Sequence, residues 1–175
     1  MIQCEVPEEL HNFLNSVFAV VGIGNEIRGD DGVGVYIVKE AGKNFPGMFL
    51  VAGMAIENYV FKITGLPQKK ILLIDSVDFG ERPGYMELIP LSALRGQGIS
   101  THSLSLNKIN VFFEEAGKEV MLLGIQGKNT QIGDIISQPV KKSAENIIDF
   151  FRKKLTGINA KCRVSPSATL GTVRI

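Results

Sequence analysis

The amino-acid sequence predicts an α/β fold built around a mostly parallel sheet. Short, continuous runs of apolar residues alternate along the chain with longer segments in which apolar residues recur at helical spacing. Strands without polar positions are typical of parallel sheets, because helices cover both faces of such a sheet. The alternation of strands and helices therefore favours an α/β sandwich.

The apolar runs give the expected strands. Gly22 stops the first run, Asp75 ends the third, and the turn signal Arg82-Pro83-Gly84 precedes the fourth. The expected strands are residues 17–21, 49–52, 71–74, 85–89 and 120–125.

The amphipathic segments give the expected helices. The last of them has the clearest apolar stripe, and Pro139 suits its first turn. The expected helices cover residues 7–14, 33–41, 56–63, 106–113 and 140–155.

Length and composition fit one domain. The chain has 175 residues, of which 45% are hydrophobic, enough for a substantial core. We expect a single domain at 1–155, in which 1–15 form an N-terminal extension, and a C-terminal tail at 156–175. Cys4 and Cys162 are expected to be free thiols in a reducing compartment, with a disulfide between them as the alternative.

Charge and hydropathy exclude several classes of partner. The formal net charge of +1 offers no electrostatic attraction to nucleic acid or to an anionic membrane. No apolar run approaches the roughly 18 residues that span a bilayer. The N-terminus lacks the pattern of a signal peptide. We therefore expect a cytoplasmic protein that binds neither nucleic acid nor membrane. We also expect the protein to be a monomer.

Two acidic motifs follow expected strands. Asp30 and Asp31 lie in a glycine-rich segment, residues 22–34, and Asp75 ends the strand at 71–74. Ligands of open parallel sheets bind beyond the carboxyl ends of the strands. Asp31 and Asp75 should therefore face one cleft if these strands are parallel neighbours. The local alternatives are that Asp30 is a helix N-cap and that Asp75 accepts hydrogen bonds from nearby backbone amides.

The glycine-rich segment does not fit a nucleotide-binding or calcium-binding loop. After Gly22 and Gly24, the third glycine of a dinucleotide fingerprint is replaced by Ile27, and carboxylates at this place would repel phosphate. The alternating acidic ligands of an EF-hand are absent as well. We expect the glycines to leave room for a protein tail to approach the backbone.

The chain has two histidines. His11 lies in an expected helix remote from the acidic motifs and is predicted to be a surface residue, whereas His102 lies in a polar loop ahead of a helix. Alone, a histidine in such a place is more often a loop or capping residue than a ligand. Together with Asp31 and Asp75 it would complete a mixed nitrogen and oxygen set, which suits a first-row transition metal better than calcium or magnesium.

The ordered motifs resemble the hydrogenase maturation endopeptidases. They are Gly22-Ile23-Gly24-Asn25, Asp30-Asp31-Gly32-Val33-Gly34, Ile74-Asp75-Ser76-Val77-Asp78-Phe79-Gly80 and Thr101-His102-Ser103, and the segments Leu123-Gly124-Ile125-Gln126 and Ser137-Gln138-Pro139 resemble the HycI-type branch. The similarity covers roughly residues 17–155.

The resemblance implies a fold and a function. The fold would be a three-layer α/β/α sandwich with a twisted central sheet. The enzyme would remove a C-terminal peptide from the nickel-loaded precursor of a [NiFe] hydrogenase large subunit. Asp31, Asp75 and His102 would be both the metal-contacting and the catalytic residues, and the nickel would be supplied by the substrate rather than held by the enzyme.

Several chemical questions stay open at this stage. Water could be activated by the metal or by the carboxylate of Asp31 or Asp75, the second of which would make the enzyme an aspartic-type endopeptidase. Asp30 and Asp78 would support the ligands. A Ser–His–Asp triad is disfavoured because no nucleophile elbow is present. The rival functions are a metal-recognising maturation chaperone that does not cut, and an aminopeptidase-like metal hydrolase.

Overall fold

The computed structural model describes residues 5–43, 45, 47–94 and 103–162, and its centre is a five-stranded sheet. The strand order is β2-β1-β3-β5-β4. The first four strands in this order are parallel, and β4 runs antiparallel to β5 at one edge. The strands are β1 (Phe18–Ile23), β2 (Phe49–Gly53), β3 (Lys70–Val77), β4 (Met86–Pro90) and β5 (Glu119–Gln126).

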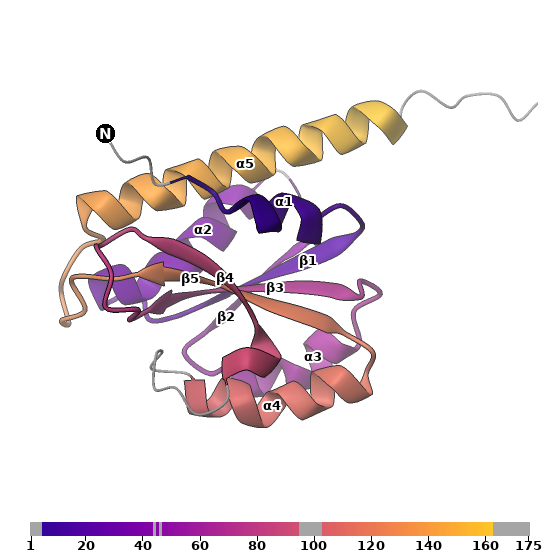
Figure 1. The fold of residues 1–175 in the computed structure, drawn as a ribbon, viewed down its shortest axis with the longest axis horizontal. Helices are drawn as coiled ribbons and strands as arrows, with labels where there is room; N and C mark the ends of the chain where they lie inside the picture. Colours follow the sequence, from indigo (N-terminus) through magenta and orange to yellow (C-terminus); the bar gives the residue numbers. More distant parts are fainter. Residues whose placement is uncertain (1–4, 44, 46, 95–102, 163–175) are drawn as a thin grey trace, which may run out of the picture.

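Helices cover both faces of the sheet, which confirms the three-layer α/β/α sandwich (Figure 1). One layer holds α1 (Glu8–Phe13), α2 (Val33–Gly42) and α5 (Gln138–Cys162). The other holds α3 (Val60–Thr64) and α4 (Ser103–Glu115). Short 3-10 turns complete the described elements: η1 (Gly29–Gly32), η2 (Ile56–Tyr59) and η3 (Leu91–Leu94).

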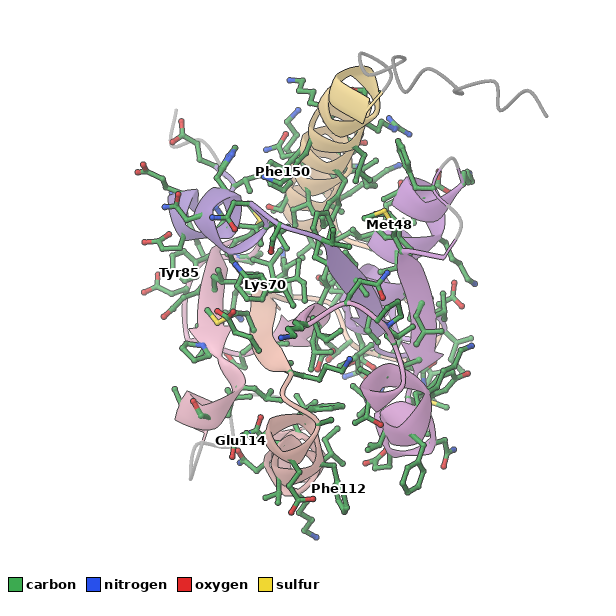
Figure 2. All side chains as sticks on the ribbon, turned by 90° about the vertical axis from the view of Figure 1, so that its right-hand side faces the viewer. Met48, Lys70, Tyr85, Phe112, Glu114 and Phe150 are labelled. Carbon is green, nitrogen blue, oxygen red and sulfur yellow. The ribbon has the colours of Figure 1, made fainter. Side chains whose placement is uncertain are left out.

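Two apolar cores lie between these layers. Seen along the strands in Figure 2, Phe150 of α5 lies on one side of the sheet, and Phe112 of α4 lies on the other. Alternate residues of each strand contribute to opposite cores, as in β1, where Val20 packs under α5 and Val21 packs over α4. Both cores are closed by the helical stripes expected from the sequence.

The N-terminal residues belong to the first core. Leu10, Phe13 and Leu14 are buried there, against residues of α5. Helix α5 itself continues to Cys162, so the first part of the segment 156–175 is helical. Within the described residues, no helix has both the length and the apolar character that would let it cross a membrane.

Strand β3 extends further than the sequence predicts. We expected the third strand to end at Ile74, with Asp75 in the following loop, but β3 continues to Val77 and Asp75 pairs with Gly124 of β5. The strand continues because backbone hydrogen bonds to β5 persist beyond the apolar run. Asp75 therefore lies on a strand rather than on a loop.

Candidate active site

Both acidic motifs lie at the carboxyl edge of the sheet. Strands β1 and β3 are parallel neighbours with Gly22 opposite Ile74, as the single-cleft hypothesis requires. After β1 the chain enters the turn η1, which carries Asp30 and Asp31 and contacts β3. The turn η1 and the end of β3 are thus adjacent.

The glycines of the first motif allow this close packing. A Cβ atom at Gly34 would lie 2.1 Å from the carbonyl oxygen of Ile74, and one at Gly24 would lie 1.8 Å from that of Asp31. Gly24 also has a positive φ of 122°, which favours glycine. Our expectation that these glycines leave room for a substrate tail is wrong, because the protein's own backbone fills that space.

Asp31 and Asp75 are both withdrawn from solvent. The side chain of Asp75 is fully buried, and Asp31 is 8% exposed. One carboxylate oxygen of Asp75 accepts a 2.8 Å hydrogen bond from the N–H of Ser76, and Asp31 accepts a 3.3 Å bond from the N–H of Asn25. Both groups have further interactions within the protein. The local alternative for Asp75, a bond to a nearby backbone amide, is therefore observed.

Asp30 is a structural anchor rather than a helix N-cap. Helix α2 follows Gly32 and has no side-chain cap. The buried carboxylate of Asp30 instead accepts hydrogen bonds from the N–H groups of Lys128 and Asn129 at 2.8 and 2.9 Å. It also accepts bonds from the N–H and the hydroxyl of Ser137 at 2.6 and 2.9 Å. These four bonds satisfy a buried charge and hold both ends of the loop 127–137.

Asp78 is part of a second anchored connection, between β3 and β4. Its carboxylate accepts hydrogen bonds from the N–H of Gly80 and from the side-chain amide of Gln126. The bond from Gly80 lowers the pKa of Asp78 the most, and the bond from Gln126 lowers it further. The carbonyl oxygen of the Gln126 side chain in turn accepts bonds from the N–H groups of Phe79 and Glu81. Asp78 therefore shapes the loop beside the site.

His102, the third expected ligand, lies outside the described residues. Among those that the structure does describe, no three His, Cys, Asp or Glu side chains could hold a metal ion together. His11 is exposed on α1, as predicted, and its ring packs edge-on against Phe150 at 4.6 Å between centroids. Cys4 is also outside the described residues, as is the side chain of Cys162, so their redox state stays a prediction.

Sequence analysis did not select Ser137 and Gln126 as functional residues. Both are polar and buried, at 8% and 7% exposure, and each holds a loop at the carboxyl edge. The aspartates that they contact, Asp30 for Ser137 and Asp78 for Gln126, lie far away in the sequence. The available signal was that both lie in the segments that resemble the HycI-type branch.

Proteins that are similar to this chain in sequence and fold include proteases of hydrogenase maturation. The model of the family HycI, hydrogenase maturation protease, matches residues 35–153. The hydrogenase 3 maturation protease of Escherichia coli K12 is 30% identical over 128 residues, which are 71% of this chain and 82% of that protein.

Solved structures agree. The [NiFe] hydrogenase maturation protease HycI of Thermococcus kodakarensis superposes with a TM-score of 0.75 and 27% identity, over 85% of this chain and 99% of that one. The endopeptidase HybD of Escherichia coli, at 19% identity and a TM-score of 0.67, shares the fold over 82% of this chain and 94% of that one. With the fold, the ordered motifs and the matched family in agreement, this chain belongs to the hydrogenase maturation proteases and is a peptide hydrolase.

Proposed function

We propose that this protease removes the C-terminal peptide from the nickel-loaded precursor of a [NiFe] hydrogenase large subunit, and that Asp31, Asp75 and His102 contact the substrate's nickel. The observation that carries the proposal is the arrangement of the first two residues. The carboxylate of Asp31 lies in η1, the turn that follows β1, and that of Asp75 lies near the end of β3, the parallel neighbour of β1; both are shielded from water. Desolvated carboxylates bind a cation more strongly than exposed ones do.

The chemistry of this donor set fits a transition metal. Two carboxylates and one imidazole leave coordination positions for ligands that the substrate supplies. Because Asp75 is fully buried, a metal carried by another protein can reach it only when groups around it move aside. We therefore expect the engaged enzyme to differ in conformation from the free one.

The hydrolysis requires a general base and a water molecule. In our proposal a carboxylate, Asp31 or Asp75, takes a proton from water as the water oxygen attacks the scissile carbonyl carbon. The same proton then passes to the amine of the departing peptide. The nickel is a part of the substrate and reports that the precursor is loaded before the bond is cut.

The decisive experiment compares nickel-loaded and nickel-free precursor. Each is incubated with the purified protease, and the mass of the large subunit is measured over time. We expect loss of one short C-terminal peptide from the nickel-loaded form only. Efficient cleavage of the nickel-free form would refute recognition of the metal.

The same experiment separates the rival functions. A stable complex with an uncut precursor would indicate a maturation chaperone. Hydrolysis of short, unrelated peptides in the absence of the precursor would indicate an aminopeptidase-like metal hydrolase. We expect neither, because the family consists of maturation proteases.

Oligomeric state and location belong to the same proposal. We propose a monomer that acts in the cytoplasm, where a precursor is folded and loaded before its maturation. The near-neutral charge and the ordinary hydrophobic content are compatible with this. Elution volume in gel filtration and fractionation of cells test the two statements.

A further inference from the structure

Three isoleucines beside the site are exposed to solvent. Ile27, Ile132 and Ile135 are 61%, 75% and 80% exposed. They lie in two connections at the carboxyl edge of the sheet, the segment that leads from β1 to η1 and the loop 127–137 that leads from β5 to α5 (orange, at the left of Figure 1). Large aliphatic side chains normally gain from burial, and a group of exposed ones marks an interaction site.

Backbone hydrogen bonds join the two connections. The N–H of Gly133 donates to the carbonyl oxygen of Ile27 at 2.8 Å. The guanidinium of Arg28 donates to the carbonyl oxygen of Thr130 at 3.0 Å. Ile27 therefore lies on a backbone segment that adjoins the one carrying Ile132 and Ile135. We call these three residues the isoleucine rim.

The rim is preorganised, because Asp30 holds the loop that carries two of its members. The carboxylate of Asp30 binds Lys128 and Asn129 at the start of the loop and Ser137 at its end. A loop fixed at both ends loses little further entropy when a partner docks on it. The isoleucines are thus held in place by the same turn that carries Asp31.

We propose that the isoleucine rim is the docking surface for an apolar segment of the protein substrate, adjacent to the tail that is cut. The proposal rests on the function proposed above. Its first ground is continuity with the site: the rim is joined through Asp30 to the turn of Asp31, so the body of a protein whose tail reaches Asp31 lies against it.

The second ground is the chemistry of the rim. Two charged side chains of these connections bind backbone atoms of the loop 127–137: Arg28 donates to the carbonyl oxygen of Thr130, and Asp134 accepts a 2.9 Å bond from the N–H of Gln131. The exposed side chains of Ile27, Ile132 and Ile135 themselves are aliphatic. An apolar partner segment matches such a surface, and a strongly charged one does not.

The test uses the double variant Ile132→Gln/Ile135→Gln and a matched control. Val17→Gln is the control, because Val17 is also β-branched, is 71% exposed and precedes β1 at the opposite edge of the sheet. Initial rates are measured over a range of concentrations of nickel-loaded precursor. We expect the double variant to raise KM by roughly 10- to 100-fold and to leave kcat unchanged. The control variant is expected to match the wild type in both.

The result that overturns the proposal is an unchanged KM in the double variant, or a loss confined to kcat. All proteins in the comparison should have the same thermal midpoint, since the substituted side chains are exposed. If the wild type leaves the precursor uncut, the proposed function fails instead. The Kd for the precursor then tests the docking surface without any cleavage. Equal Kd values for the wild type and the double variant would refute the docking surface, and a Kd that is roughly 10- to 100-fold higher in the double variant would support it.

Discussion

The carboxylate of Asp30 accepts a 2.6 Å hydrogen bond from the N–H of Ser137, a residue 107 positions later in the chain. This bond and the other hydrogen bonds to the Asp30 carboxylate join the turn η1, which follows β1, to the loop just before α5. Asp30 and Asp31 are neighbours in the sequence, but they have different surroundings. Asp30 bonds the loop 127–137, whereas Asp31 bonds the segment that leads into η1.

Replacing Asp30 by Asn should cost about 3 kcal/mol of unfolding free energy. The amide NH₂ would face backbone N–H donors, and buried donors would lose their acceptor. Ser137→Ala is the graded control, because it removes only the hydroxyl bond and should cost about 1 kcal/mol. Chemical denaturation of both variants measures the difference. Equal losses in the two would contradict the central role of Asp30.

Gly34→Ala should destabilise the fold strongly, by about 3 kcal/mol or more. The added methyl group would lie 2.1 Å from the carbonyl oxygen of Ile74 and 2.5 Å from that of Ile23, so the start of α2 would have to move off the sheet. Gly157→Ala is the opposite control. Gly157 lies within α5 with nothing within 4 Å, and alanine there should add up to about 1 kcal/mol. Thermal unfolding compares both with the wild type.

Asp31→Asn, Asp75→Asn and His102→Ala should each abolish processing of the nickel-loaded precursor. Each substitution removes a negative charge or a metal ligand while keeping a side chain of similar or smaller size. Cleavage is followed by mass spectrometry, and circular dichroism checks that the fold is retained. Normal processing by all three variants would refute the assignment of the site.

Asp78 should stabilise the folded protein at neutral pH and lose this effect in acid. Hydrogen bonds in the folded state lower the pKa of Asp78 below its ordinary value of 3.8. The folded state therefore binds this proton less tightly than the unfolded state does, and the stabilisation is present above pH 3.8 and is lost as the pH falls through the folded pKa. Asp78→Ala should lower the thermal midpoint at pH 7 and approach the wild type at the acid end. A deficit that is independent of pH would contradict this linkage.

The fold was predictable from the sequence because its signals are local. Apolar runs gave five strands, and apolar stripes gave the helices, within a few residues at most ends. The extension of β3 beyond Ile74 was not predictable, because it depends on pairing with β5, which begins more than forty residues later. The antiparallel direction of β4 is equally a property of the assembled sheet.

The site was predictable only in part. The adjacency of the two acidic motifs followed from the expected parallel pairing of the strands before them, whereas the roles of Asp31, Asp75 and His102 stay predictions. The function of Asp30 did not, since aspartate before a helix is most simply explained as a cap and its partners are about a hundred residues away. The glycines were also misinterpreted, because a sequence does not show whether the space beside a glycine is open or filled.

The bonds of Asp30 have a consequence for the nascent chain. The ribosome synthesises η1 before the loop 127–137, so the carboxylate of Asp30 cannot bind these partners until residue 137 has been made. The C-terminal end of β3 likewise can pair with β5 only after β5 has been synthesised. The carboxyl edge of the sheet can therefore reach its final arrangement only after the loop 127–137 has been synthesised.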